Sequence, residues 1–178
     1  MPTDHAPEAD RRILLIGMMG SGKSTIGKAL AARTGWPYHD NDDLLERAAG
    51  RTAREILEAD GEAAMRRAEA DVVEAGLAEE PPVIVATAAG TVMDPEVRAR
   101  IAGGGLVVWL DAAPEVLAAR AAGGEHRPFL DHDPVGWFRR ASRERGPAYR
   151  EIADVTVDTG TTSVADALDT ILEQSART

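Results

Sequence analysis

The segment Ile13–Thr25 constrains the fold more than any other part of the chain. It combines an apolar run, a glycine-rich turn and the start of a polar helix, and Gly17–Ser24 fits G-x-x-x-x-G-K-[ST]. This pattern is typical of a phosphate-binding loop. The glycines let backbone N–H groups point inward, and the helix N-terminus adds a positive field. A glycine-rich turn that binds nothing is the alternative, but the flanking strand and helix favour a nucleotide site.

Length and charge limit what kind of protein this is. The 178 residues predict one domain, 12–178, after a flexible tail at 1–11. The chain has no cysteine, which excludes disulfides, thiolate metal sites and cysteine nucleophiles. No apolar run near the N-terminus is long enough for a membrane segment, so we expect a cytoplasmic protein. The net charge of −10 argues against nucleic acid and anionic membranes as partners. We also expect a monomer.

Short apolar segments alternate with helical segments along the chain. This alternation predicts a three-layer α/β/α fold around a mostly parallel, five-stranded sheet. The expected strands are 13–16, 36–39, 83–86, 106–110 and 155–157. Ligands of such sheets bind at the carboxyl ends of the strands. Those ends carry Gly17–Ser24, Asp40–Asp43, Thr87–Thr91 and the residues after Leu110.

Three helix signals lead to specific expectations. We expect a helix over Leu44–Ala49, after the acidic cluster. A capping box at Thr52–Glu55 predicts the next helix, with Ile56 and Leu57 facing inward. A long helix is expected over 134–152, and Gly146-Pro147 is expected to break it, because proline lacks the helical N–H.

Asp40 and Asp42 are the first candidates for chemistry beyond phosphate binding. They follow the predicted strand 36–39, next to the phosphate loop. One carboxylate could lie near magnesium, together with the Ser24 hydroxyl, and the other could face an acceptor hydroxyl. A solvated acidic turn is the alternative, which the neighbouring loop disfavours. His39 beside these aspartates gives thin support for a transition-metal site, because a single histidine is too few.

Arginines provide the positive charge that an acidic protein needs at an anion site. Arg66, Arg127 and Arg145 lie on separate segments, so only the fold can bring them together. Arg127 lies in a glycine-flanked loop next to a proline, which is typical of a closing flap. We therefore expect a mobile lid at about 123–133.

These motifs together resemble the shikimate kinase family, from Ile13 to Ile171. The matching motifs are the phosphate loop at 17–25, D-x-D at 40–42, G-E-x-x-[FM]-R at 61–66 and R-x-P-x-Y at 145–149, and Arg-Pro-Phe-Leu at 127–130 is similar to the R-P-L-L lid of the family. Arg120 falls where the family has an arginine that packs on adenine. The motifs occur in the family's order and with nearly its spacing.

The resemblance implies a kinase that uses ATP and Mg²⁺ to phosphorylate the 3-hydroxyl of shikimate. It implies ATP binding by Gly20, Ser21, Gly22, Lys23, Ser24, Thr25 and Arg120. It implies magnesium binding by Ser24 and Asp40, and catalysis by Lys23, Asp42 and Arg127. The acceptor, a small hydroxylated anion, would be bound by Asp42, Arg66, Ala88, Ala89, Gly90 and Arg145.

One stretch departs from the family. Where the family has Gly-Gly-Gly against the substrate, this chain has Ala88-Ala89-Gly90. The two methyl groups are expected to narrow the pocket, and they would be strained if the backbone needs positive φ. A different cyclitol or hydroxy acid is therefore an alternative acceptor. A gluconate-kinase-like enzyme fits the paired arginines less well, and a regulatory ATP-binding module without transfer activity is the alternative from another class.

Overall fold

Five parallel strands form the sheet of this protein. The computed structural model describes residues 11–123 and 130–177. The strands are β1 (Arg12–Ile16), β2 (Tyr38–His39), β3 (Val83–Ala86), β4 (Leu106–Asp111) and β5 (Val155–Asp158). They lie in the order β2-β3-β1-β4-β5, and all four pairings are parallel. The predicted fold class is confirmed, and the strand that leads into the phosphate loop lies at the centre of the sheet.

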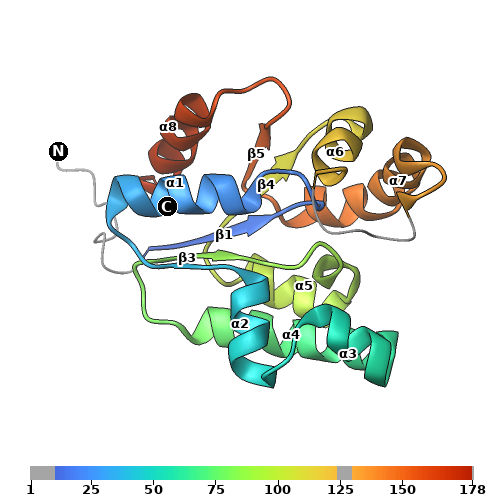
Figure 1. The fold of residues 1–178 in the computed structure, drawn as a ribbon. Helices are drawn as coiled ribbons and strands as arrows, with labels where there is room; N and C mark the ends of the chain where they lie inside the picture. The colour runs from blue at the N-terminus through green and yellow to red at the C-terminus, as the bar shows by residue number, and fades with distance from the viewer. Residues whose placement is uncertain (1–10, 124–129, 178) are drawn as a thin grey trace, which may run out of the picture.

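Helices cover both faces of this sheet (Figure 1). They are α1 (Lys23–Thr34), α2 (Asn41–Ala49), α3 (Ala53–Asp60), α4 (Glu62–Ala78), α5 (Pro95–Ala102), α6 (Pro114–Ala121), α7 (Pro134–Ile152) and α8 (Val164–Ser175). A 3₁₀ turn, Thr91–Met93, precedes α5. Within the described residues, none of the helices has both the length and the apolar character that crossing a bilayer requires.

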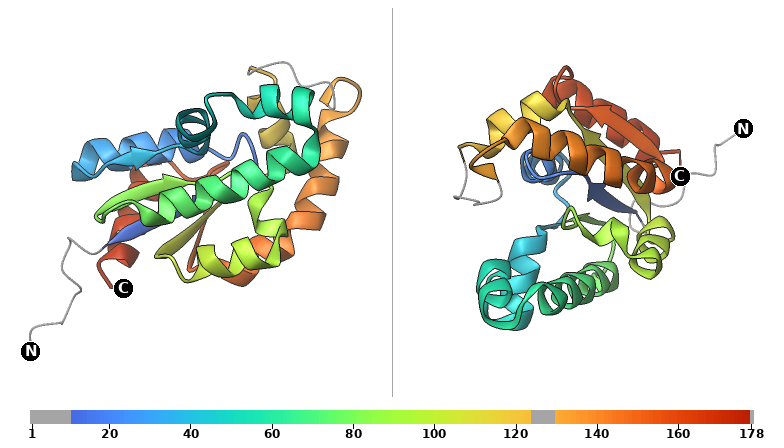
Figure 2. Two further views of the ribbon diagram at one scale, coloured as in Figure 1. Left: turned by 90° about the horizontal axis from the view of Figure 1, so that it is seen from below. Right: turned by 90° about the vertical axis from the view of Figure 1, so that its right-hand side faces the viewer.

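The alternation of side chains along β1 divides the core into two layers. Ile13 and Leu15 pack with α1 and α8, whereas Leu14 and Ile16 pack with the helices of the opposite face. All four side chains are buried, because a central parallel strand has helices on both sides. Helices α2–α4 lie toward the β2 edge of the sheet and helices α6–α8 toward the β5 edge. The two groups lie on opposite sides of the phosphate loop (Figure 2).

The helix after β2 begins earlier than expected. It starts at Asn41 and not at Leu44, because the Asp40 side chain caps it by accepting from the Asp42 backbone N–H. Aspartate is among the preferred capping residues, and negative charge in the first turn of a helix is stabilising. As a consequence, Asp42 lies on the first turn of α2 and not in a free loop.

Two other helix expectations were wrong in part. The capping box of α3 is present, with Ile56 buried, but Leu57 is 43% exposed, because only one face of this short helix packs on its neighbours. Helix α7 continues through Gly146 and Pro147. Its buried face, which includes Phe138 before the proline and Tyr149 after it, packs on one core. This burial outweighs the roughly 3 kcal/mol that a proline costs inside a helix.

Candidate active site

The phosphate loop turns between β1 and α1 at the carboxyl end of the central strand. Gly20 and Gly22 have φ values of 76° and 96°, a region that other residues rarely adopt. Gly22 is the N-cap of α1, so the first N–H groups of the helix open toward the loop. Lys23 Nζ donates to the carbonyls of Gly17 (2.8 Å) and Met18 (3.0 Å). The ammonium group of Lys23 is therefore hydrogen-bonded to the backbone of its own loop.

Burial also changes the acidity of this lysine. It lowers the pKa of Lys23 to about 8, although the nearby carboxylates of Asp40 and Asp42 act in the opposite direction. A negative phosphate group at the loop would add to the effect of the carboxylates and favour the ammonium form. The site is therefore electrostatically suited to an anion that arrives from outside.

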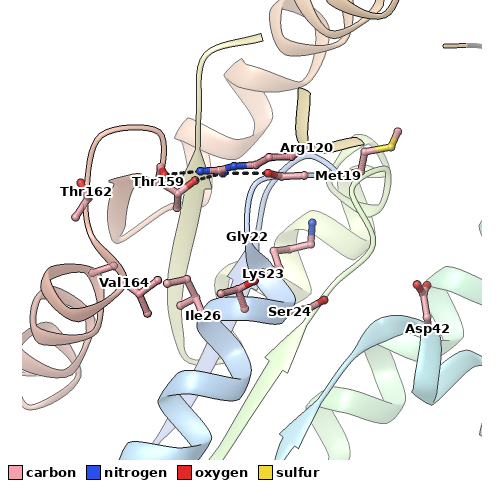
Figure 3. A pocket seen from close by; sticks show the side chains of 13 residues that line it. Met19, Gly22, Lys23, Ser24, Ile26, Asp42, Arg120, Thr159, Thr162 and Val164 are labelled. Atoms are coloured by element: carbon pink, nitrogen blue, oxygen red, sulfur yellow. Dashed lines mark hydrogen bonds between the residues drawn. The ribbon is translucent and has the colours of Figure 1, made fainter. Parts of the chain in front are cut away.

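A pocket of about 580 Å³ lies over the loop (Figure 3). Among the residues predicted to bind ATP, those that line it are Gly20, Gly22, Lys23, Ser24, Thr25 and Arg120. Ser21, also predicted, is fully buried behind the loop. Asp42 lines the pocket from α2, on the far side of the loop from Arg120. The pocket thus brings six of the seven residues predicted to bind ATP, and Asp42, to one place.

Arg120 is held in place by a residue that sequence reasoning missed. Its guanidinium donates to Thr159 Oγ1 (3.0 Å), to the Thr159 carbonyl (2.7 Å) and to the Gly20 carbonyl (3.1 Å). Thr159 Oγ1 in turn lies 2.8 Å from the Ser21 carbonyl oxygen. Thr159 directly follows β5, so its place at a strand end was the signal that could have found it.

Asp40 is the most highly connected carboxylate of the site. Its Oδ2 accepts from the hydroxyls of Ser24 (2.7 Å) and Tyr38 (2.6 Å), and its Oδ1 accepts from the Asp42 N–H (3.2 Å). Burial alone would raise the pKa of Asp40, but these hydrogen bonds and the charge of Lys23 hold it below its ordinary value. Asp40 is therefore ionised at neutral pH.

This arrangement fits a magnesium ion. Ser24 and Asp40 come from two different elements and present hard oxygen atoms to each other beside the phosphate loop. Mg²⁺ is usually held by one or two such oxygens together with phosphates and water. Within 11–123 and 130–177, three potential His, Cys, Asp or Glu ligands do not gather anywhere. The donor set thus suits magnesium, and no histidine-based transition-metal site is found in that part of the chain.

The two described arginines that were predicted to bind the acceptor come from α4 and α7. Arg66 on α4 pairs with Glu62 one turn earlier, with Nε 3.1 Å from Glu62 Oε1. Arg145 on α7 is half-buried, with Nη1 3.8 Å from Met18 Sδ of the phosphate loop and the guanidinium over the Trp137 ring. The Arg145 Nε is buried without a hydrogen-bond partner. Such a donor is suited to an anionic ligand.

Glu69 of α4 lies near Asp42, Arg66 and Arg145, and sequence reasoning did not identify it. Burial raises the pKa of Glu69, and the negative charge of Asp42 adds to the rise, whereas Arg66 and Arg145 oppose it. The carboxyl group is therefore close enough to all three predicted acceptor residues to interact with their charges. The available signal was its position on α4, three residues after Arg66 and hence on the same face.

The loop after β3 contains Ala88, Ala89 and Gly90. The Ala89 carbonyl accepts from the Tyr149 hydroxyl (2.6 Å), which fixes the loop to α7. No described residue other than glycine has positive φ, and Gly90 itself has φ −87°. The two alanines are therefore not strained by their backbone. Gly90 faces Glu69, since a Cβ on it would lie 3.9 Å from Glu69 Oε2.

Arg127 and most of the expected lid lie outside the described residues. The lid and the division into a tail and one domain therefore stay predictions. Of the expected lid, Gly123 and residues 130–133 are described. Leu130 packs against the core on the α7 side of the sheet.

A phosphate loop that follows the central strand of a parallel sheet defines a P-loop nucleotide-binding protein. A family model described as shikimate kinase matches residues 19–176. The chain belongs to the shikimate kinase family, whose members are phosphotransferases that act on a hydroxyl group and use ATP with Mg²⁺.

Individual relatives agree with this assignment. The chain is 44% identical over 165 residues to shikimate kinase of Symbiobacterium thermophilum, covering 91% of this chain and 94% of the relative. It is 43% identical to that of Bradyrhizobium diazoefficiens, covering 88% and 79%. Shikimate kinase from Acinetobacter baumannii, solved in complex with shikimate, superposes with a TM-score of 0.86 at 31% identity, over 94% and 93% of the chains.

A gluconokinase from Sinorhizobium meliloti is also similar in structure. It superposes with a TM-score of 0.63 at 23% identity, over 96% of this chain and 94% of the other. An identity this low shows a shared fold and nothing about the acceptor.

Proposed function

We propose that this protein transfers the γ-phosphoryl group of ATP to the 3-hydroxyl of shikimate. The observation that carries the proposal is Arg145, whose Nη1 lies 3.8 Å from Met18 Sδ of the phosphate loop, together with Asp42 in the pocket over that loop and Arg66 near Glu69. Two guanidiniums suit a carboxylate of the acceptor, and Asp42 suits one of its hydroxyls. The solved relative in complex with shikimate supports the same acceptor.

The residues divide the reaction between them. The acceptor oxygen forms a bond to the γ-phosphorus, the bond from that phosphorus to the β–γ bridging oxygen breaks, and ADP leaves. Asp42 orients the hydroxyl and accepts its proton, while Lys23 and the loop N–H groups neutralise the phosphate charge. Arg127 is proposed to add positive charge at the transferring group. Arg66 and Arg145 hold the acceptor carboxylate. Catalysis of this kind depends on positioning and charge more than on covalent help.

Ser24 and Asp40 are the residues that would hold Mg²⁺. The ion supplies charge neutralisation on the phosphates when it is bound. On the nucleotide side, Arg120 and Thr159 form the wall of the pocket beside the loop, where the base of ATP is proposed to lie. Gly20, Ser21, Gly22 and Thr25 complete the loop that surrounds the phosphates.

The remaining parts of the proposal concern the protein's surroundings. We propose that it works as a monomer in the cytoplasm, on a small hydroxylated anion, without nucleic-acid or membrane partners. The net charge of −10 supports the last point, because polyanionic surfaces would repel such a protein.

An ADP-release assay with shikimate, quinate and gluconate tests the function. We expect turnover with shikimate and at least about a hundredfold less with the other two acids, because the paired arginines and Asp42 must engage at once. Lys23→Ala should lower kcat by about a hundredfold or more while the far-UV spectrum is unchanged. Preference for another acid would favour the alternative suggested by Ala88-Ala89. Nucleotide binding without release of ADP for any acceptor would indicate a regulatory module.

A further inference from the structure

Tyr38 links the edge strand β2 to the first carboxylate of the site. Its hydroxyl donates to Asp40 Oδ2 over 2.6 Å, and Ser24 donates to the same oxygen over 2.7 Å. With the Asp42 N–H on Oδ1, three donors fix the carboxylate. Ser24 lies on α1 and Asp42 on α2, so Tyr38 is the donor that ties Asp40 to the sheet.

The backbone of Tyr38 is held by the sheet. Tyr38 pairs with Ile84 of β3, and the Ile84 N–H donates to the Pro37 carbonyl over 2.9 Å. The ring packs on the α1 side of the sheet, next to the cluster that includes Ile84. The position from which the hydroxyl reaches Asp40 is therefore set by the pairing of β2 with β3.

Gly27 of α1 provides the surface on which the ring lies. A Cβ at Gly27 would lie 2.6 Å from Tyr38 Cζ and 2.7 Å from Cδ2, so any side chain would displace the ring. Gly27 is not among the glycines with positive φ, so its backbone does not require glycine. A glycine inside a helix costs about 1 kcal/mol relative to alanine. The space for the Tyr38 ring is the structural reason for this glycine.

We propose that Tyr38, supported by Gly27, is a positioning residue for the divalent cation of the nucleotide site. Its hydroxyl holds Asp40 in the orientation in which this carboxylate and Ser24 receive Mg²⁺. Residues that orient a metal ligand in this way commonly contribute about ten- to a hundredfold to metal affinity or activity. The inference rests on the proposed magnesium-dependent function and deepens it, by assigning a role to two residues outside the phosphate loop and the D-x-D motif.

A role in packing alone is the competing explanation, and Tyr38→Phe separates the two. Phenylalanine keeps the ring against Gly27 and removes only the hydroxyl. The test is calorimetric titration of the full-length protein with ADP, once with Mg²⁺ and once with EDTA. The dissociation constant in EDTA divided by the dissociation constant in Mg²⁺ measures how strongly magnesium and nucleotide binding are coupled. No acceptor is present, so the result does not depend on which acid the enzyme phosphorylates.

We expect Tyr38→Phe to reduce this ratio by about tenfold while the affinity for ADP in EDTA is unchanged. Gly27→Ala should reduce the ratio in the wild type and have no further effect in the Tyr38→Phe background, because both changes act on the same hydrogen bond. If Gly27→Ala does not fold, the Tyr38→Phe result alone decides.

Two matched controls complete the test. Gly146→Ala adds the same methyl inside a helix where nothing lies within 4 Å, and it should leave the ratio unchanged. Tyr149→Phe removes a hydroxyl that donates to Ala89, and it should also leave the ratio unchanged. An unchanged ratio in Tyr38→Phe, or an equal loss of affinity with and without Mg²⁺, would overturn the proposal. If the wild type does not phosphorylate shikimate but Tyr38→Phe still lowers the ratio, only the proposed acceptor is overturned.

Discussion

Lys23 can bond to the carbonyls of its own loop or to the phosphate oxygens of a nucleotide, and in this structure it bonds to the carbonyls. Its ammonium group donates to the carbonyls of Gly17 and Met18. Phosphate oxygens carry more negative charge than carbonyls, so a bound nucleotide is the stronger partner. Burial lowers the pKa of Lys23 to about 8 before the nucleotide binds. Proton uptake should therefore accompany nucleotide binding in mildly alkaline solution.

This coupling predicts how nucleotide affinity depends on pH. The protein without ligand loses the Lys23 proton as the pH rises through about 8, whereas the bound phosphates keep it. ADP affinity measured in EDTA should therefore fall by roughly tenfold between pH 7.5 and 9, since each pH unit above the pKa weakens binding by up to about tenfold. Lys23→Arg is the control, because a guanidinium keeps its proton and should give a flat profile. A flat profile in the wild type would contradict the prediction.

The acceptor arginines should show a different signature from the lysine. Arg66→Ala and Arg145→Ala should each raise the acceptor KM by about ten- to a hundredfold, because each removes a charge-assisted hydrogen bond. The KM for ATP should not change. Arg67→Ala removes a neighbouring exposed charge on α4 and should leave both constants as they are. A rise in the KM for ATP, with a normal acceptor KM, would show that these arginines serve the nucleotide instead.

Among the elements, the loop after β3 is the one where a departure from the family was expected, with Ala88-Ala89-Gly90 in place of Gly-Gly-Gly. Its backbone is tied to α7 through the hydrogen bond from Tyr149 to Ala89, and the alanines do not require positive φ. The methyl groups thus stiffen the loop without strain. Alanine restricts the backbone more than glycine does, by about 0.4–1 kcal/mol for each residue. The structure therefore offers a physical reason to retain them.

The double change Ala88→Gly, Ala89→Gly tests this interpretation. If shikimate is the acceptor that this pocket fits, its kcat/KM should stay the same or fall by up to about tenfold, because the loop gains conformational freedom. The KM for ATP should be unaffected, since the phosphate loop follows a different strand. Steady-state kinetics with both substrates measure this. A higher kcat/KM for shikimate would mean that the methyl groups fit another acid better.

How far each element could be predicted depends on how local its cause is. β1 and the phosphate loop are contiguous in sequence, so pattern alone identified them. The start of α2 was misplaced because Asp40 was interpreted only as a ligand, although it also caps the helix. The break expected at Pro147 does not occur, since the buried face of α7 is held on both sides of it.

Contacts between distant segments were beyond sequence reasoning. Thr159 lies 39 residues from the Arg120 that it holds, and no local pattern connects the two. Glu69 becomes notable only when α2, α4 and α7 place their charges around it. Tyr38 and Gly27 lie on different elements, and their contact is visible only in the folded chain.

For the molecule as a whole, the net negative charge is not neutralised by the protein's own ion pairs. The chain carries −10, and its surface ion pairs, such as Arg33–Asp169 and Arg54–Glu58, are largely exposed. Exposed pairs contribute little to stability, whereas repulsion among excess carboxylates opposes the compact state. Salt weakens both effects, and for this composition the repulsion should be the larger one.

The midpoint of thermal unfolding should therefore rise with moderate salt. Increasing NaCl from about 10 to 150 mM shortens the screening length from roughly 30 to 8 Å. A gain of about 1 kcal/mol corresponds to roughly 2–4 °C for a chain of this size. Differential scanning calorimetry at pH 7.5 measures it, and KCl should give the same shift if the effect is screening. A fall in the midpoint would mean that the ion pairs outweigh the repulsion.

The strand order has a consequence for how acceptor preference can change. β2 and β3 lie on one side of β1, so the chain between them forms one uninterrupted segment, from Tyr38 to Met93, that carries Asp42, Arg66, Glu69 and the Ala88–Gly90 loop. Arg145 is the proposed acceptor residue outside it. The segment begins and ends beside the phosphate loop, which stays on the central strand. Two crossovers that flank this segment could therefore exchange most of the proposed acceptor residues together, along with Tyr38 and Asp40, and leave the phosphate loop, Arg120 and Thr159 in place.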